Sequence, residues 1–117
     1  MKIRIKGNSI RYRLVKSEVK QLAEKGYIEE KTTFSEQELT YRLESKPKIH
    51  ELEIAFIENK IILFLPENEA KSWVDSDRIT YKNNFEKLSL LLEKDFVCLD
   101  HTDEDQSDNY ENPNRTC

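Results

Sequence analysis

Glycine is nearly absent from this chain of 117 residues, and so are the motifs that depend on it. Gly7 and Gly26 are the only glycines, so the sequence has no glycine-rich loop of the kind that holds a nucleotide phosphate. No nucleophile paired with a base can be located either. We therefore expect a binding protein that is not an enzyme and needs no cofactor.

Long hydrophobic runs are missing as well. No segment approaches the roughly 18 consecutive apolar residues of a membrane span. The first residues, MKIRIKGN, have the pattern of a strand and lack the apolar core of a signal peptide. The sequence therefore predicts a cytoplasmic protein that contacts no membrane. Its apolar residues, 37% of the total, recur at regular spacings, and the length suits a single domain.

Only two cysteines are present, both near the C-terminus. Together with one histidine they supply ligand types that zinc accepts: Cys98, His101 and Cys117. The set is incomplete, and a reducing cytosol favours free thiols over a disulfide. A zinc site, a disulfide and two independent thiols remain the three alternatives. The segment 100–117 is acidic, which predicts a solvated terminus or a tail folded back over a basic surface.

Residues 3–34 and 54–85 have similar sequences. A shift of 51 residues without a gap makes nine of 32 positions identical, among them Asn8 with Asn59 and Phe34 with Phe85. The apolar positions also stay in register, so we interpret the chain as one supersecondary unit that occurs twice.

Each copy has the pattern of two strands, a short helix and two further strands. In the first copy, polarity alternates from Lys2 to Leu14 around the turn Gly7-Asn8-Ser9, and a helix of about ten residues ends at Gly26. Two strands around the polar turn 35–38 complete the copy. We predict one domain over 1–99, with repeat one at 1–46 and repeat two at 50–99, and an acidic tail at 100–117.

The motif Lys6-Gly7-Asn8-Ser9, followed by the strand Ile10–Leu14, an amphipathic helix and Gly26, resembles the swapped-hairpin domain of AbrB-like regulators and MazE-type antitoxins. The second copy keeps Asn59 and Pro66 from that pattern. In that family two chains interleave into one barrel. The resemblance therefore implies an α+β fold with a pseudo-two-fold axis, a small closed β-barrel of two tandem ββαββ repeats with two short helices. The whole chain also resembles short, uncharacterised bacterial proteins.

The two halves of the chain differ in charge. Residues 1–48 contain twelve Lys/Arg and seven Asp/Glu, a net +5, whereas residues 49–117 contain seven and sixteen, a net −9. The resemblance implies DNA binding through the first hairpin, since lysine and arginine bind phosphates and arginine also reads guanine. The DNA-contacting residues would be the outward cations of that hairpin and the asparagine of its turn: Lys2, Arg4, Lys6, Asn8, Arg11 and Arg13.

The second copy has Ile62 and Phe64 at the positions of Arg11 and Arg13. This apolar outer face favours a second hypothesis, a protein-interaction or oligomerising module that binds no nucleic acid. The sequence thus leaves two alternatives. One is an AbrB-like DNA-binding regulator or antitoxin-like protein, and the other is a module that binds another protein through Ile62 and Phe64.

Overall fold

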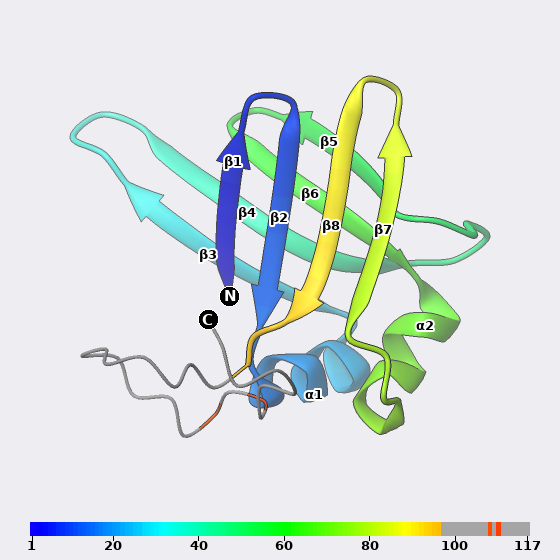
Figure 1. The fold of residues 1–117 in the computed structure, drawn as a ribbon. Coiled ribbons are helices and arrows are strands. Elements are labelled where there is room, and N and C mark those ends of the chain that lie inside the picture. Colours follow the sequence, from blue (N-terminus) through cyan, green and yellow to red (C-terminus); the bar gives the residue numbers. More distant parts are fainter. Residues whose placement is uncertain (97–107, 109, 111–117) are drawn as a thin grey trace.

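The computed structural model describes residues 1–96, Asp108 and Tyr110. These residues form eight strands, two α-helices and one 3₁₀ helix, so the described part is mostly β (Figure 1). In chain order the elements are β1 (Lys2–Lys6), β2 (Ser9–Leu14), α1 (Lys16–Lys25), β3 (Tyr27–Thr33), β4 (Glu38–Lys46), β5 (Glu53–Ile57), β6 (Lys60–Pro66), α2 (Glu67–Ser72), η1 (Trp73–Asp75), β7 (Thr80–Phe85) and β8 (Leu88–Lys94).

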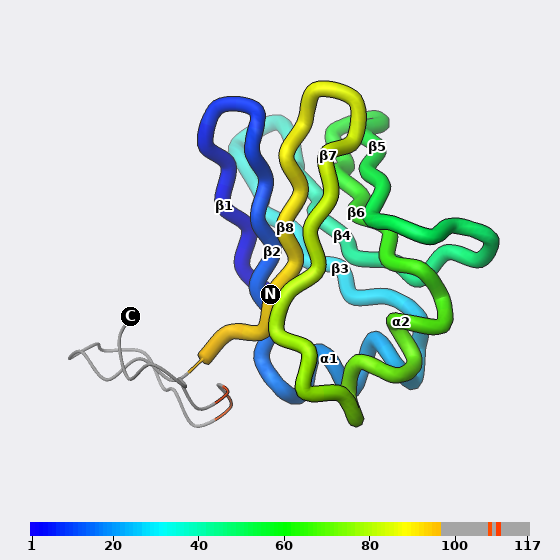
Figure 2. Tube along the Cα trace, turned by 45° about the vertical axis from the view of Figure 1, so that its right-hand side comes forward, coloured from blue at the N-terminus to red at the C-terminus, as the bar shows by residue number. Residues whose placement is uncertain are grey.

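The strands form two four-stranded mixed sheets. Sheet A has the order β1-β2-β8-β7, and sheet B has the order β3-β4-β6-β5. Neighbouring strands are antiparallel except at the centre of each sheet, where β2 runs parallel to β8 and β4 runs parallel to β6. Each central pair therefore joins the first half of the chain to the second. The strands of sheet A cross those of sheet B, and both helices lie at one end of the molecule (Figures 1 and 2).

The prediction of a closed α+β barrel made of two ββαββ repeats is wrong. Within the described residues no strand of sheet A pairs along its backbone with a strand of sheet B, so β1, β7, β3 and β5 remain edge strands. The turn at Asn8 lies in sheet A, whereas the turn at Asn59 lies in sheet B. The physical reason for the error is that alternating polarity fixes which face of a strand is buried but not which strands lie beside it.

Local chemistry sets the ends of the elements. Helix α1 ends where Gly26 adopts a left-handed conformation with φ of 85°, and the Gly26 N–H donates to the Leu22 carbonyl at 2.9 Å. The β5–β6 turn has positive φ at Glu58 (50°) and Asn59 (64°), which is the conformation of a tight two-residue hairpin. Helix α2 has six residues and tightens into η1, which buries Trp73.

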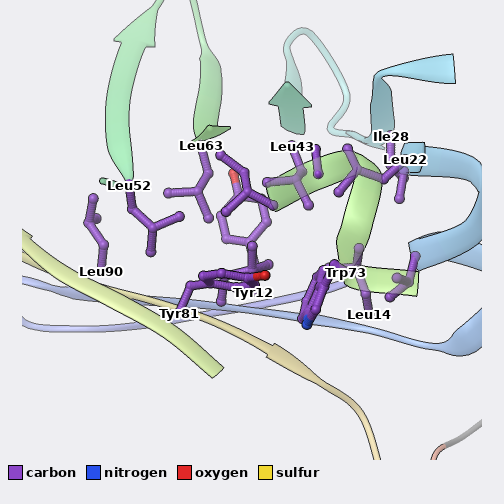
Figure 3. Close-up of a cluster of buried hydrophobic side chains, with 14 of the residues drawn as sticks. Tyr12, Leu14, Leu22, Ile28, Leu43, Leu52, Leu63, Trp73, Tyr81 and Leu90 are labelled. Atoms are coloured by element: carbon purple, nitrogen blue, oxygen red, sulfur yellow. The ribbon is translucent and has the colours of Figure 1, made fainter. Parts of the chain in front are cut away.

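One hydrophobic core fills the space between the sheets and the helices (Figure 3). The Tyr12 hydroxyl of sheet A donates to the Ile61 carbonyl of sheet B at 3.3 Å, which links the two sheets inside the core. Trp73 and Tyr81 meet edge to face with their ring centroids 5.2 Å apart. The largest fully buried side chains are Trp73, Tyr12, Leu14, Leu22, Leu43, Leu52, Leu63, Leu65, Leu90, Leu92 and Val19.

The two core tyrosines predict a loss of stability at alkaline pH. Burial raises the pKa of Tyr12 above its ordinary value of 10.0, and burial together with the carboxylate of Glu69 raises the pKa of Tyr81. Both hydroxyls keep their protons in the folded protein, whereas in the unfolded chain they ionise near pH 10. Their contribution to stability is therefore complete below about pH 10 and is lost as the pH rises above it. We expect the free energy of unfolding to fall by about 2 kcal/mol between about pH 10.5 and 11.5.

Urea titrations at these two pH values measure that fall. The matched control carries Tyr12→Phe and Tyr81→Phe, which remove both hydroxyls and leave the aromatic rings in the core. The control should lose much less stability than the wild type over the same pH interval. An equal loss in both proteins would show that other groups cause the alkaline destabilisation.

Candidate nucleic-acid interface

The outer face of sheet A carries all five cations that the sequence assigns to DNA contact. Side chains of a strand point alternately to its two faces. Because Ile10, Tyr12 and Leu14 are buried, the residues between them point outward. The antiparallel register of β1 and β2 then aligns the basic residues in rows across the face: Lys2 opposite Arg13, Arg4 opposite Arg11, and Lys6 opposite Ser9.

Strands β8 and β7 extend this face by one further cation, Lys82. The register places Leu91 of β8 beside Arg11 of β2, and Lys82 of β7 beside Leu91. A row that starts at Arg4 therefore crosses all four strands and ends at the exposed Lys82. Sequence reasoning missed Lys82. Polarity alternates along β7 and shows that Lys82 points outward, but it does not show that β7 shares a sheet with β1. We call these six cations the basic face: Lys2, Arg4, Lys6, Arg11, Arg13 and Lys82.

Two carboxylates neutralise part of the basic face. Glu93 Oε1 lies 2.7 Å from Nε of Arg13 and 3.6 Å from Nε of Arg11, so both arginines share one carboxylate. Asp95, buried after the end of β8, lies 3.3 Å from the Lys2 ammonium. Six cations and these two carboxylates give a net charge of +4.

The other three cations of the basic face, Arg4, Lys6 and Lys82, are exposed and form no ion pair with any described residue. Arg4 also lines two open pockets on this surface. One is shared with Lys6, Ser9 and Arg11, and the other extends toward Lys2 and Arg13. An anion that docks in either pocket would meet the Arg4 guanidinium, whose charge is not offset by a carboxylate of the described residues.

Asn8, the sixth predicted contact, lies in the β1–β2 turn and touches the β7–β8 turn. Its side-chain amide donates to the Lys87 carbonyl at 3.5 Å, and its own carbonyl accepts the Ser89 N–H at 2.9 Å. Asn8 therefore links the two hairpins of sheet A, and its side-chain amide has a structural role.

The outer face of sheet B is charged but balanced. The Glu29 carboxylate lies 3.3 Å from the Arg42 guanidinium and 3.5 Å from the Lys60 ammonium, and Arg42 Nε lies 2.6 Å from Glu44. Partial desolvation of Glu29 favours its neutral form, but the cations Arg42 and Lys60 outweigh it and lower the pKa of Glu29. The outer faces of the two sheets thus differ in net charge. The charges described on sheet B are paired with one another, whereas those on sheet A leave an excess of positive charge.

Ile62 and Phe64, the residues predicted to bind a protein partner, lie on this outer face of sheet B. Both belong to β6 and are half-buried. The Lys46 ammonium lies 4.7 Å from the centroid of the Phe64 ring and covers it. The most exposed apolar residue on this side is Ile57 at the edge strand β5, with 59% of its surface accessible.

The predicted zinc ligands Cys98, His101 and Cys117 lie outside the described residues. Among residues 1–96, Asp108 and Tyr110, no group of three or more His, Cys, Asp or Glu side chains is arranged to bind a metal ion. No helix in this part of the chain has the length and apolar character needed to cross a membrane.

Comparison with known proteins identifies one family and does not confirm the AbrB-like resemblance. The chain matches a family of unknown function, DUF7009, along almost its whole length. No curated protein and no solved structure matches it. Since the match spans residues 1–114, the chain belongs to the family of unknown function DUF7009.

Proposed function

We propose that this protein is a non-enzymatic DNA-binding protein and that the basic face of sheet A binds the phosphate backbone of duplex DNA. The observation that carries the proposal is the set of exposed cations without an ion pair among the described residues, Arg4, Lys6 and Lys82, beside the partly neutralised Arg11 and Arg13. A cation without an ion pair can bind a phosphate without first leaving a carboxylate. Its binding is favourable because it releases counterions condensed on the DNA.

The width of the basic face suits a duplex. Arg4 and Lys82 lie three strands apart, which corresponds to about 14 Å at the usual strand spacing. The major groove of B-DNA is about 12 Å wide. Cations at the two edges of sheet A can therefore reach phosphates on both sides of one groove while Arg11 lies between them.

The first test is the salt dependence of binding by the wild-type protein. Contacts with three to five phosphates predict that the logarithm of the association constant falls with the logarithm of salt concentration, with a slope of about −3 to −4. Fluorescence anisotropy with a labelled duplex of about 20 base pairs, from about 50 to 200 mM NaCl, should show an affinity loss of about 100-fold.

A second, unrelated duplex serves as the control for sequence preference. Affinities for the two duplexes should agree within about threefold, since phosphate contacts carry no sequence information. Absence of binding at about 50 mM salt with about 100 µM protein would overturn the proposal, because non-specific DNA binders reach dissociation constants at or below that concentration.

The alternative function, a protein-interaction surface at Ile62 and Phe64, has weaker support. Both side chains are half-buried, and Phe64 is covered by Lys46, which also pairs with Glu53 at 3.2 Å. A partner would have to displace this cover before it reached the ring. The basic face needs no such rearrangement, and for that reason we prefer DNA binding.

A further inference from the structure

Two residues from the end of the chain, Asp108 and Tyr110, lie against the start of α1 and the end of β8. They are separated from β8 by more than ten residues in sequence, yet both are partly buried against described elements. Tyr110 packs against the hydrophobic core. These contacts form a compact site with two parts, one for a carboxylate and one for an aromatic ring.

The first part is the N-terminus of α1. Its N-cap residue is Val15, whose side chain cannot accept a hydrogen bond. The Glu18 carboxylate accepts the N–H of Val15 itself, at 3.0 Å, and its other oxygen accepts from the Met1 ammonium. Asp108 accepts the next two backbone donors. Its carbonyl accepts the Lys16 N–H at 3.0 Å, and its Oδ1 accepts the Ser17 N–H at 3.2 Å. The Ser17 hydroxyl donates to the other carboxylate oxygen. Asp108, which is distant from α1 in the sequence, thus caps the N-terminus of this helix in place of the local N-cap residue.

The second part encloses the ring of Tyr110. Its backbone N–H donates to the Asp95 carbonyl at 2.7 Å, and its ring meets Phe96 edge to face with the centroids 6.0 Å apart. The ammonium groups of Lys94 and Lys16 lie 4.7 and 5.7 Å from the centroid of the same ring. Lys94 is 5% exposed and donates to the Ser76 carbonyl at 2.7 Å, so the core holds this cation in place.

We propose that the start of α1 and the end of β8 form a recognition site for peptides of the form Asp-x-Tyr, and that the chain's own Asp108 and Tyr110 occupy it. The contacts described above are all made by the Asp or the Tyr. The N–H and hydroxyl of Ser17 hold the carboxylate, and the Lys16 N–H holds the Asp108 carbonyl. Two cations and Phe96 hold the ring. None of these contacts depends on how the segment is connected to β8. The site should therefore bind the same sequence when it is supplied as a separate peptide.

The test uses the full-length chain and a synthetic peptide with the sequence of residues 106–112, Gln-Ser-Asp-Asn-Tyr-Glu-Asn. The variant Asp108→Ala with Tyr110→Ala leaves the site without its resident ligand. We expect the peptide to bind this variant with a dissociation constant below about 1 mM, since a tethered segment has an effective concentration in the millimolar range. Backbone amide shifts of Lys16 and Ser17 in ¹⁵N NMR titrations measure the binding.

Wild-type protein is the matched control, because its own segment competes for the site. The peptide should bind wild type at least about tenfold more weakly than it binds the double variant. A peptide with alanine at both key positions should bind neither protein. If the double variant does not fold, the single change Tyr110→Ala takes its place, because it leaves the cap of α1 intact.

Three results would overturn the proposal. The first is the absence of saturable amide shifts when the peptide is added to a folded variant at several millimolar. The second is equal affinity for wild type and variant, which would mean that the chain's own segment does not occupy the site. The third is a wild-type dimer that the double substitution makes monomeric in sedimentation equilibrium, since the occupant would then come from a second copy.

Discussion

Replacing Trp73 with alanine is expected to lower the free energy of unfolding by about 3–5 kcal/mol. Trp73 has no exposed surface, and its ring meets Tyr81 edge to face at 5.2 Å. The indole N–H donates to the Arg78 carbonyl at 2.7 Å and so fixes the chain between η1 and β7. The substitution opens a cavity in the centre of the core and removes the partner of that carbonyl, and both effects act in the same direction.

Urea denaturation followed by far-ultraviolet circular dichroism measures this loss. The neighbouring residue offers a matched control, because Val74 is 38% exposed although it belongs to the same 3₁₀ helix. Val74→Ala should change the free energy of unfolding by less than about 1 kcal/mol. A loss of similar size for both variants would mean that Trp73 does not anchor the core in the way its burial indicates.

Reversing two charges on the basic face is expected to weaken DNA binding by about 100-fold or more at about 50 mM salt. The variant carries Arg4→Glu and Lys6→Glu, which replace two exposed cations that have no ion pair among the described residues. Each lost phosphate contact reduces the slope of the salt dependence by about one unit, so the slope should become shallower by about two. Stability should change little, since both side chains are exposed.

The matched control changes net charge by the same amount elsewhere. Lys20→Glu with Lys25→Glu alters exposed residues of α1, away from sheet A. This control should retain wild-type affinity within about threefold and lose less than about 1 kcal/mol of stability through the helix dipole. Equal weakening by both variants would show that overall charge drives DNA association. In that case the basic face would have no special role.

The local structure was predictable from the residues. Alternation in Ile10–Leu14 separates the buried Tyr12 from the outward Arg11 and Arg13, and Gly26 marks the end of α1 because only glycine adopts its conformation without strain. These features depend on a few neighbouring side chains. The pairing of strands was not predictable in the same way, because the parallel contacts of β2 with β8 and of β4 with β6 arise from packing between distant segments.

The candidate site was likewise predictable only where it depends on local sequence. The cations of β1 and β2 could be named because one hairpin carries them all. Lys82, Glu93 and Asp95 entered the site only when β7 and β8 were placed beside that hairpin. Two of these three residues are acidic and reduce the net charge of the face. The sequence of the first hairpin alone therefore overestimates how many cations are available to bind a phosphate.

The strand order also bears on how the protein is made in the cell. The centre of sheet A needs β8, which ends at Lys94, so a nascent chain still lacking that strand leaves β2 with one open edge. Pairings between such distant segments form slowly, and unpaired edges invite association with other chains. We therefore expect the N-terminal half to acquire its final structure only after β8 has left the ribosome.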